Sequence, residues 1–283
     1  MEWGERTQVM GILNVTPDSF WDGGETTTVE AALDRARCFD AWGADWIDVG
    51  GESTGPGSRD VSTDEELARV LPVVTALAKT LSLPISVDTT KAAVAEAALA
   101  AGASLINDVG ALRWDPAMAG VIARAGAGVV LMYSKDDTPR TTTRAVAYDD
   151  VVDTVVTFLR ERIAYARAEG IAPDRIVVDP GMGWFLGADP SYSYAVLRGL
   201  DRIRALGYPV LVGPSRKSFL AHDGIHPPYP AADRLMPTAA AVATAAWLGA
   251  AVVRVHDVKE MVQVVGTVEA IKRPEVVAGR GGK

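Results

Sequence analysis

The chain has 283 residues with 28 basic and 36 acidic side chains, which gives a formal net charge of −8. A hydrophobic fraction of 48% and a charged fraction of 23% are typical of a globular protein with a sizeable core, and they exclude a disordered chain. The negative charge argues against broad binding to nucleic acid or anionic membranes, although it allows a local basic pocket for a small anion.

Other features of the composition favour a cytoplasmic protein. The only cysteine, Cys38, excludes an internal disulfide and fits a reducing compartment. The first six residues lack the basic region and apolar stretch of a signal peptide. The most apolar segment, residues 239–253, is alanine-rich and too short to span a bilayer. We therefore expect a soluble, cytoplasmic protein with one core.

Short β-branched segments alternate with longer amphipathic segments along the chain. Eight strands are expected at 9–13, 46–49, 85–87, 104–106, 129–132, 176–178, 210–212 and 252–255. Helices are expected at 28–42, 63–80, 91–101, 117–125, 149–169, 191–206, 237–248 and 258–271. Eight successive βα units predict an α/β fold, a single-domain (β/α)8 TIM barrel over residues 1–273, followed by a flexible tail over residues 274–283. A doubly wound sheet is the main alternative, but the regular strand spacing favours a closed barrel.

Polar side chains stand at or just beyond the carboxyl ends of the expected strands. In barrel enzymes the reacting groups lie at these ends, which converge on one cavity. A single polar residue there is more often a helix cap or a loop tether, so the repetition is what indicates function. Seven of the eight strand ends carry such a residue: Asn14, Asp48, Asp88, Asn107, Asp179, Lys217 and the pair Arg254 and His256. The remaining strand, the fifth, ends in Met132.

Three members of this ring, Asp88, Asn107 and Asp179, suit a flat heterocycle with adjacent N–H donors and acceptors. Two of them also have simpler interpretations. Asp88 precedes a Thr-Thr-Lys segment and could cap the next helix, an interpretation of equal weight. Asp179 precedes Pro-Gly, where an Asx-turn is the simple explanation.

Arg254 and His256 alternate along the last strand, so their side chains point to the same face. Two such donors form a small anion site, and arginine is suited to bidentate phosphate contacts. Asn14 offers a neutral oxygen that could help to hold Mg²⁺ beside the anion. A histidine on an apolar strand is usually a core residue, but the neighbouring arginine favours a functional role.

Several sequence blocks resemble the signatures of the dihydropteroate synthase family of folate-pathway enzymes. Residues 10–24 (MGILNVTPDSFWDGG) resemble the first signature, and residues 43–56 (GADWIDVGGESTGP) resemble the second. Later blocks match at 87–89 (VDT), 106–108 (IND), 178–181 (VDPG), 215–218 (SRKS) and 254–257 (RVHD). The resemblance covers residues 7 to about 271, and the blocks occur in the order of the family.

The resemblance implies a TIM-barrel transferase that condenses 6-hydroxymethyl-7,8-dihydropterin diphosphate with 4-aminobenzoate, giving 7,8-dihydropteroate and diphosphate. It also implies Mg²⁺ as cofactor and a homodimer. The net charge leads us to expect no nucleic-acid or membrane partner. The pterin would be bound by Asp88, Asn107, Met132, Asp179 and Lys217, and the diphosphate by Asn14, Thr54, Arg254 and His256. Asn14 would contact the metal, and the aminobenzoate site would be framed by Phe20, Pro56, Trp184, Lys217 and Ser218. The catalytic residues would be Asp88, Asp179, Lys217, Arg254 and His256.

The mechanism implied by the resemblance is a dissociative substitution at the methylene carbon of the pterin. Cationic groups neutralise the leaving diphosphate, and carboxylates stabilise the developing pterin cation. The arylamine is mostly neutral at pH 7, so it needs no strong general base. The glycine-rich loops after the first two strands are expected to close and exclude water.

Three positions depart from the family pattern. Gly55 stands where the family has arginine, residues 132–135 (MYSK) replace a Met-His-Met-Gln run, and residues 183–186 (GWFL) replace Gly-Phe-Gly-Lys. Losing the arginine could weaken diphosphate binding by about 1–3 kcal/mol. We hypothesise that Arg59 or Lys135 compensates for the missing arginine. Unchanged diphosphate affinity in the alanine variants of both residues would contradict this hypothesis. The preferred interpretation is sequence drift at the rim of the site. The family is a target of sulfonamides, and the changed residues at the rim of the site would decide whether this chain is sensitive to them.

Two alternatives stay open at this point. A methyltransferase that binds methyltetrahydrofolate shares the barrel and the pterin pocket, but the pair Arg254 and His256 and the intact first loop argue against it. A paralogue that binds pterin without synthase activity is suggested by Gly55 and the loop changes, whereas the intact ring favours an enzyme.

Overall fold

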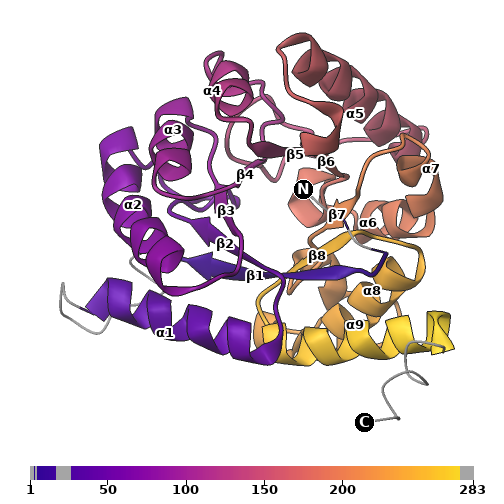
Figure 1. The fold of residues 1–283 in the computed structure, drawn as a ribbon. Helices are drawn as coiled ribbons and strands as arrows, with labels where there is room; N and C mark the ends of the chain where they lie inside the picture. The colour runs from indigo at the N-terminus through magenta and orange to yellow at the C-terminus, as the bar shows by residue number, and fades with distance from the viewer. Residues whose placement is uncertain (1–2, 4, 17–26, 275–283) are drawn as a thin grey trace.

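The computed structural model describes residues 3, 5–16 and 27–274 of the chain. Eight parallel strands form a ring, and helices surround it on the outside (Figure 1). The strands are β1 (Gln8–Asn14), β2 (Trp46–Gly50), β3 (Ile85–Asp88), β4 (Leu105–Asp108), β5 (Gly128–Met132), β6 (Ile176–Asp179), β7 (Leu211–Val212) and β8 (Val252–Val255). The expected single-domain (β/α)8 TIM barrel is therefore confirmed.

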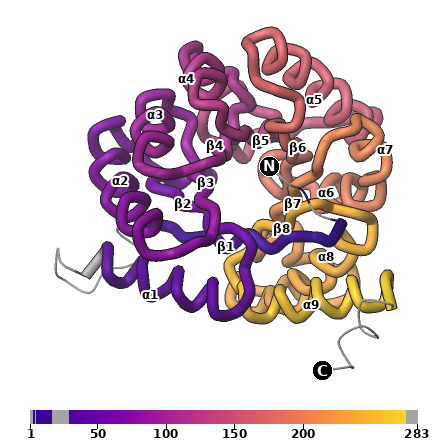
Figure 2. The backbone as a smooth tube through the Cα atoms, viewed as in Figure 1, coloured from indigo at the N-terminus to yellow at the C-terminus, as the bar shows by residue number. Residues whose placement is uncertain are grey.

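The helices lie between successive strands and shield the outer face of the barrel (Figure 2). They are α1 (Thr27–Trp42), α2 (Thr63–Thr80), α3 (Ala92–Ala100), α4 (Met118–Ala125), α5 (Val151–Ala168), α6 (Pro190–Arg198), α7 (Leu200–Arg204), α8 (Leu235–Trp247) and α9 (Val258–Lys272). Sequence chemistry sets several of their ends. The Ser62 side chain accepts a hydrogen bond from Glu65 N at 3.1 Å and caps α2, and Gly126 ends α4 in the left-handed conformation.

The hydrogen-bonded strand order is β6-β5-β4-β3-β2-β1-β8-β7. A bridge between Val178 and Val210 joins the two outer strands of this order, and Val178 N donates to Pro209 O at 2.9 Å. The sheet therefore closes on itself between β6 and β7. Closure brings the carboxyl ends of all eight strands to one end of the barrel, where the loops that follow them meet.

An apolar layer fills the opposite end of the barrel interior. It consists of Met10, Trp46, Leu105, Val130, Val177, Leu211 and Val252, with Trp3 and Ala251 packed against it. The Trp3 ring stacks on Trp46 with centroids 5.6 Å apart. The layer closes the barrel floor, so a ligand has access to the interior from the carboxyl ends of the strands.

The observed elements follow the expected ones closely, with one division that the sequence pattern did not predict. The stretch expected as one helix over 191–206 is split into α6 and α7 at Gly199. A Cβ at Gly199 would lie 3.0 Å from a methyl group of Val152 on α5. The close approach of α5 therefore requires a residue without a side chain at this point, and glycine is also a weak helix former.

Part of the C-terminal tail predicted for residues 274–283 lies outside the described residues, which end at 274. Within the described part of the chain, no helix has the length and apolar character needed to cross a membrane.

Candidate active site

Two residues beyond the floor of the barrel, the inward-facing side chains of four strands are charged or amide groups. Because side chains alternate along a strand, the second residue after each floor residue also faces the interior. On β2 this step leads from Trp46 to Asp48, and on β8 it leads from Val252 to Arg254. The same step on β4, β5 and β6 gives Asn107, Met132 and Asp179. The structure thus brings most of the predicted ring together above the apolar layer.

The strand register sets four strand ends side by side. Asn14 pairs with Gly50, Gly50 with Asp88, and Asp88 with Asn107. Gly50 carries no side chain, and a Cβ built there would lie 3.5 Å from Asn14 Oδ1 and 3.6 Å from Asp88 Cβ. The glycine therefore leaves space between the exposed Asn14 amide and the Asp88 carboxylate at the mouth of the barrel.

Arg254 bridges two carboxylates in the barrel interior. Its Nε donates to Asp48 Oδ2 at 2.6 Å, and its Nη2 donates to Asp88 Oδ2 at 2.8 Å. Asp48 also accepts a hydrogen bond from Asn107 Nδ2 at 3.1 Å. Asp48 is fully buried, and these two partners satisfy its Oδ2 atom. The simpler interpretation of Asp88 as a helix cap does not hold, because Ala92 N at the start of α3 donates instead to Asp115 Oδ2 at 2.8 Å.

Burial and the charged neighbours of Asp88 together set its protonation. Burial raises the pKa of Asp88 to about 7; the positive charge of Arg254 opposes this rise, and the negative charge of Asp48 adds to it. Burial would lower the pKa of Arg254, but the charges of Asp48 and Asp88 raise it above its usual value. Arg254 is therefore permanently charged, while Asp88 can gain or lose a proton near neutral pH.

Two buried oxygens in this cluster have no hydrogen-bond partner. They are Asp48 Oδ1 and Asn107 Oδ1, which lie next to the bonded atoms of the same side chains. Buried acceptors are normally satisfied, and exceptions often mark binding sites. These two oxygens fit a ligand that carries N–H donors into the barrel.

Asp179 and Lys217 are two further charged groups of the site, and each acts on the other electrostatically. Asp179 Oδ1 accepts from Gly181 N at 2.7 Å, so the Asx-turn expected from sequence is present. Burial raises the pKa of Asp179, against the opposing charge of Lys217. Burial likewise lowers the pKa of Lys217 to about 8, against the charge of Asp179. The Lys217 ammonium also lies 5.1 Å from the centre of the Phe185 ring.

His256 lies just beyond β8 and is oriented by Ser215. Its Nδ1 is 3.0 Å from Ser215 Oγ, and its backbone N donates to the same oxygen at 3.1 Å. Because Ser215 Oγ already accepts one hydrogen bond, its own proton is available to Nδ1, which favours the tautomer with the proton on Nε2. Burial and the charge of Arg254 lower the pKa of His256 to about 4, so the ring is neutral at pH 7.

The predicted rim residues lie on different loops. Gly183 has the positive φ that favours glycine and begins the turn that carries Trp184. A Cβ built there would be in ordinary contact with Lys217 Cβ at 3.5 Å and Ser218 Oγ at 3.6 Å, so the turn packs beside these two residues. Thr54 and the exposed Pro56 lie in the loop after β2. Phe20, the remaining predicted rim residue, lies outside the described residues.

The two side chains proposed to replace the missing loop arginine have other partners. Arg59 is exposed and forms a close ion pair with Glu65. Lys135 is buried and binds Asp136 at 2.5 Å. The structure therefore gives no support to compensation by either residue.

Sequence reasoning left two functional side chains without a role. Asp48 stood in the ring, but its partner Arg254 is 206 residues away, so the pair required the three-dimensional register. Ser215 lay within a matching block, yet nothing in the sequence linked it to His256.

Among the described residues, no group of three or more His, Cys, Asp or Glu side chains is arranged to hold a metal ion. Asn14 offers one neutral oxygen at the mouth of the barrel. Mg²⁺ usually binds through one or two protein oxygens together with substrate phosphates and water. Asn14 therefore fits a metal whose other ligands come from a phosphorylated substrate.

The sequence matches the pterin-binding enzymes over residues 10–256. The chain belongs to this family of barrel enzymes. It is 41% identical to the dihydropteroate synthase of Synechocystis sp. over 272 residues, which cover 96% of this chain and 92% of the relative.

Solved structures agree with this relationship. The Xanthomonas albilineans dihydropteroate synthase with 4-aminobenzoic acid is 43% identical, with a TM-score of 0.86 over 95% of this chain and 94% of that one. The structure of this enzyme in complex with 7,8-dihydropteroate is 41% identical, with a TM-score of 0.84 over 96% and 95%. The resemblance inferred from the sequence blocks is confirmed, and with it the expected synthase function.

Proposed function

We propose that the chain condenses 6-hydroxymethyl-7,8-dihydropterin diphosphate with 4-aminobenzoate and releases 7,8-dihydropteroate and diphosphate. The observation that carries this function is the bridge of Arg254 between Asp48 and Asp88, placed above an apolar floor. It offers buried acceptors for a heterocycle and a permanent cation for a phosphorylated leaving group in one cavity. The family match and the relatives named as synthases support this reaction.

The pterin ring would enter the barrel with its N–H groups toward the unpartnered oxygens of Asp48 and Asn107. Asp88, Asp179 and Lys217 would line its edges, and Met132, the buried last residue of β5, would contact its face. Binding there satisfies acceptors that are otherwise unpaired, which favours a donor-rich heterocycle over an apolar ring of the same size.

The diphosphate would lie at the mouth of the barrel. Arg254 uses Nε and Nη2 for the two carboxylates, which leaves Nη1 for a phosphate oxygen. His256 would donate from Nε2, and the arriving anion would raise its pKa from the low value in the free enzyme. Thr54 in the loop after β2 would add a neutral donor. Asn14 would hold Mg²⁺, which supplies charge neutralisation on the diphosphate when it is bound.

The chain's own residues then stabilise charge separation at the methylene carbon. Arg254 and His256 face the departing negative charge, and Asp48, Asp88 and Asp179 face the pterin, where positive charge develops. The aminobenzoate would be held between the loops after β2, β6 and β7 by Phe20, Pro56, Trp184, Lys217 and Ser218. Positioning of the amine can contribute several kcal/mol, up to about 7–11 in ideal cases.

We include a cytoplasmic homodimer in the proposal. The free, exposed Cys38 suits a reducing compartment. Large apolar side chains on the outer face of α8, Met236 and Trp247, suit a contact between two copies of the chain.

A product assay tests the function directly. Purified protein is incubated with the pterin diphosphate, Mg²⁺ and 4-aminobenzoate, and dihydropteroate is measured by chromatography, with Arg254→Met as the matched control. We expect product from the wild type and a loss of at least a hundredfold in the variant. Pterin binding without product would instead support the paralogue without synthase activity.

A further inference from the structure

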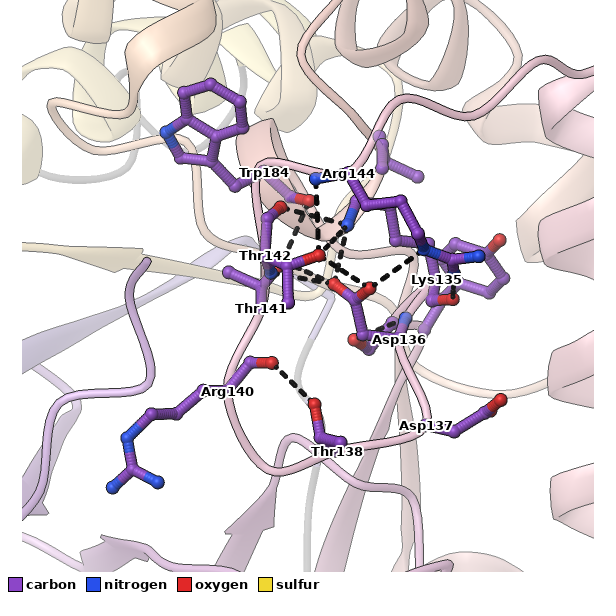
Figure 3. Close-up of polar contacts among 12 residues, drawn as sticks. Lys135, Asp136, Asp137, Thr138, Arg140, Thr141, Thr142, Arg144 and Trp184 are labelled. Atoms are coloured by element: carbon purple, nitrogen blue, oxygen red, sulfur yellow. Dashed lines mark hydrogen bonds and ion pairs between the residues drawn. The ribbon is translucent and has the colours of Figure 1, made fainter. Parts of the chain in front are cut away.

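The loop between β5 and α5, residues 133–150 (the β5–α5 loop), contains a buried polar cluster outside the substrate-binding ring. The Asp136 carboxylate accepts hydrogen bonds from Lys135 Nζ at 2.5 Å and from Thr142 N at 2.8 Å (Figure 3). Burial would raise the pKa of Asp136, but these donors lower it to about 2. The carboxylate is thus ionised at neutral pH, and its hydrogen bonds fix the shape of the loop.

Thr141 in this cluster connects the loops on either side of it. Its backbone N donates to Thr54 O in the loop after β2 at 3.1 Å. Its hydroxyl lies 2.9 Å from Trp184 O and 3.1 Å from Asp136 Oδ2, so one proton serves two acceptors (Figure 3). The side chain is buried. One residue therefore joins the loop of Thr54 to the turn of Trp184.

Arg140, the preceding residue, holds the loop between β2 and α2, residues 51–62 (the β2–α2 loop). Its guanidinium points away from the Asp136 cluster (Figure 3) and forms close ion pairs with Glu52 and Asp60. It also donates to Arg59 O at 2.8 Å. Glu52 stands near the start of the β2–α2 loop and Asp60 near its end, so Arg140 closes the loop at its base. Glu52 is held in turn by a close ion pair with Lys91.

The β2–α2 loop needs such support because of its composition. Gly55 replaces a side chain that could anchor it, and Gly57 has φ +78° with nothing within 4 Å of a built Cβ. Glycine loses more conformational freedom on ordering than other residues. If the loop had to be ordered during substrate binding, that cost would subtract from affinity.

We propose that Arg140 and Thr141 are positioning residues that hold Thr54 and Trp184 at a fixed separation across the active-site mouth. Arg140 acts on the β2–α2 loop and Thr141 on both neighbours. The inference rests on the proposed function, because it takes Thr54 to lie at the diphosphate and Trp184 at the aminobenzoate.

Steady-state kinetics of four variants of the full chain test the proposal. Arg140→Gln should raise the KM for the pterin diphosphate about 3–10-fold, as expected for one or two lost hydrogen bonds, with kcat changed less than about twofold. Thr141→Val keeps the shape but removes the hydroxyl, and it should raise the KM for 4-aminobenzoate by a similar factor. Thr141→Ser should restore it. Thr143→Val, at an exposed threonine of the same loop, is the matched control.

A second measurement separates this proposal from the proposed function. Hydrogen exchange of peptides from residues 51–62 should become at least about fivefold faster in Arg140→Gln and stay unchanged in Thr143→Val, whether or not the protein makes dihydropteroate. An inactive wild type with this exchange pattern contradicts the proposed function alone. Unchanged exchange in Arg140→Gln, or a loss of kcat with both KM values unchanged, overturns the positioning role.

Discussion

Arg254 is central to the site, because one guanidinium binds the carboxylates of both Asp48 and Asp88. Removing one partner of a buried ion pair destabilises a protein by more than the intact pair stabilises it, because the other charge is left buried and unpaired. The carboxylates of the site therefore carry negative charge that destabilises the free protein. The same charge would stabilise a cationic transition state. Two titrating groups, Asp88 and Lys217, make this arrangement measurable.

Asp88 should make the free protein less stable as the pH rises. Its folded-state pKa of about 7 exceeds the ordinary value of 3.8, so the folded state binds the proton more tightly than the unfolded state. Stability is then lost as the pH rises from about 4 to 7. Asp88→Asn mimics the protonated group and should remove this dependence. We expect the free energy of unfolding of the wild type to fall by on the order of 2 kcal/mol relative to the variant between pH 5 and pH 8.

Urea unfolding at the two pH values measures this difference. If the free energy of unfolding changes equally between the two pH values in wild type and variant, Asp88 is already ionised at pH 5. In that case the charge of Arg254 lowers the pKa of Asp88 more than burial raises it.

Lys217 should limit activity at alkaline pH. Burial lowers its pKa to about 8, so it loses its positive charge above that pH, and pterin binding near Asp179 weakens. We expect kcat/KM for the pterin diphosphate to decline above about pH 8. In Lys217→Arg the guanidinium stays charged, so the decline should move beyond pH 9 even if the activity is lower. An unchanged alkaline limb in this variant would assign the titration to another group.

At the scale of elements, the β2–α2 loop offers a direct test of the missing arginine. A Cβ at Gly55 would lie 3.6 Å from Ser53 Oγ, an ordinary contact, so the backbone here accepts a side chain such as that of Gly55→Arg. The new cation should lower the KM for the pterin diphosphate about tenfold, which corresponds to ~1.4 kcal/mol. The gain should shrink as salt is added, because the loop is exposed.

Gly55→Ala is the matched control for this substitution, because it adds the Cβ without the charge. Steady-state kinetics at two ionic strengths should show no change for the alanine variant. An equal fall in KM for both variants would attribute the effect to loop stiffening rather than to charge.

Element types were predictable from the sequence, because hydrophobic periodicity records which face of each segment is buried. The exceptions have local physical causes. The split at Gly199 depends on the contact with Val152 of α5, which periodicity along one helix cannot report. The β5–α5 loop had no visible pattern, and its order comes from the contacts of Asp136, Arg140 and Thr141 with one another and with distant loops.

At the scale of the whole molecule, strand-end reasoning predicted which residues meet, since closure of eight parallel strands brings their ends together. It could not predict which of them pair. Asp48 and Arg254 lie on β2 and β8, with β1 between them, and their contact depends on a register that offsets the strands. The contact between Asp48 and Arg254 forms only in the closed barrel. The sequence therefore predicted which residues form the ring but not which of its charged side chains pair.

The outer surface of the barrel supports a last prediction, on assembly. Met236 and Trp247 are 72% and 57% exposed. They are 11 residues apart on α8, which is about three helical turns, so they share one face. A stable dimer buries about 1,200–2,000 Å² in total, and large apolar side chains at the centre of such an interface carry much of the binding energy. We expect a dimeric mass for the wild type in light scattering at micromolar concentration.

Trp247→Glu should shift that mass to the monomer, because a carboxylate would be desolvated at the interface. Ile225→Glu is the matched control, since Ile225 is 82% exposed but lies in the loop before α8 rather than on its outer face. The active site of each chain is built from that chain's own barrel, so the monomeric variant should keep its kcat. A dimer that survives Trp247→Glu would place the contact on another face of the barrel.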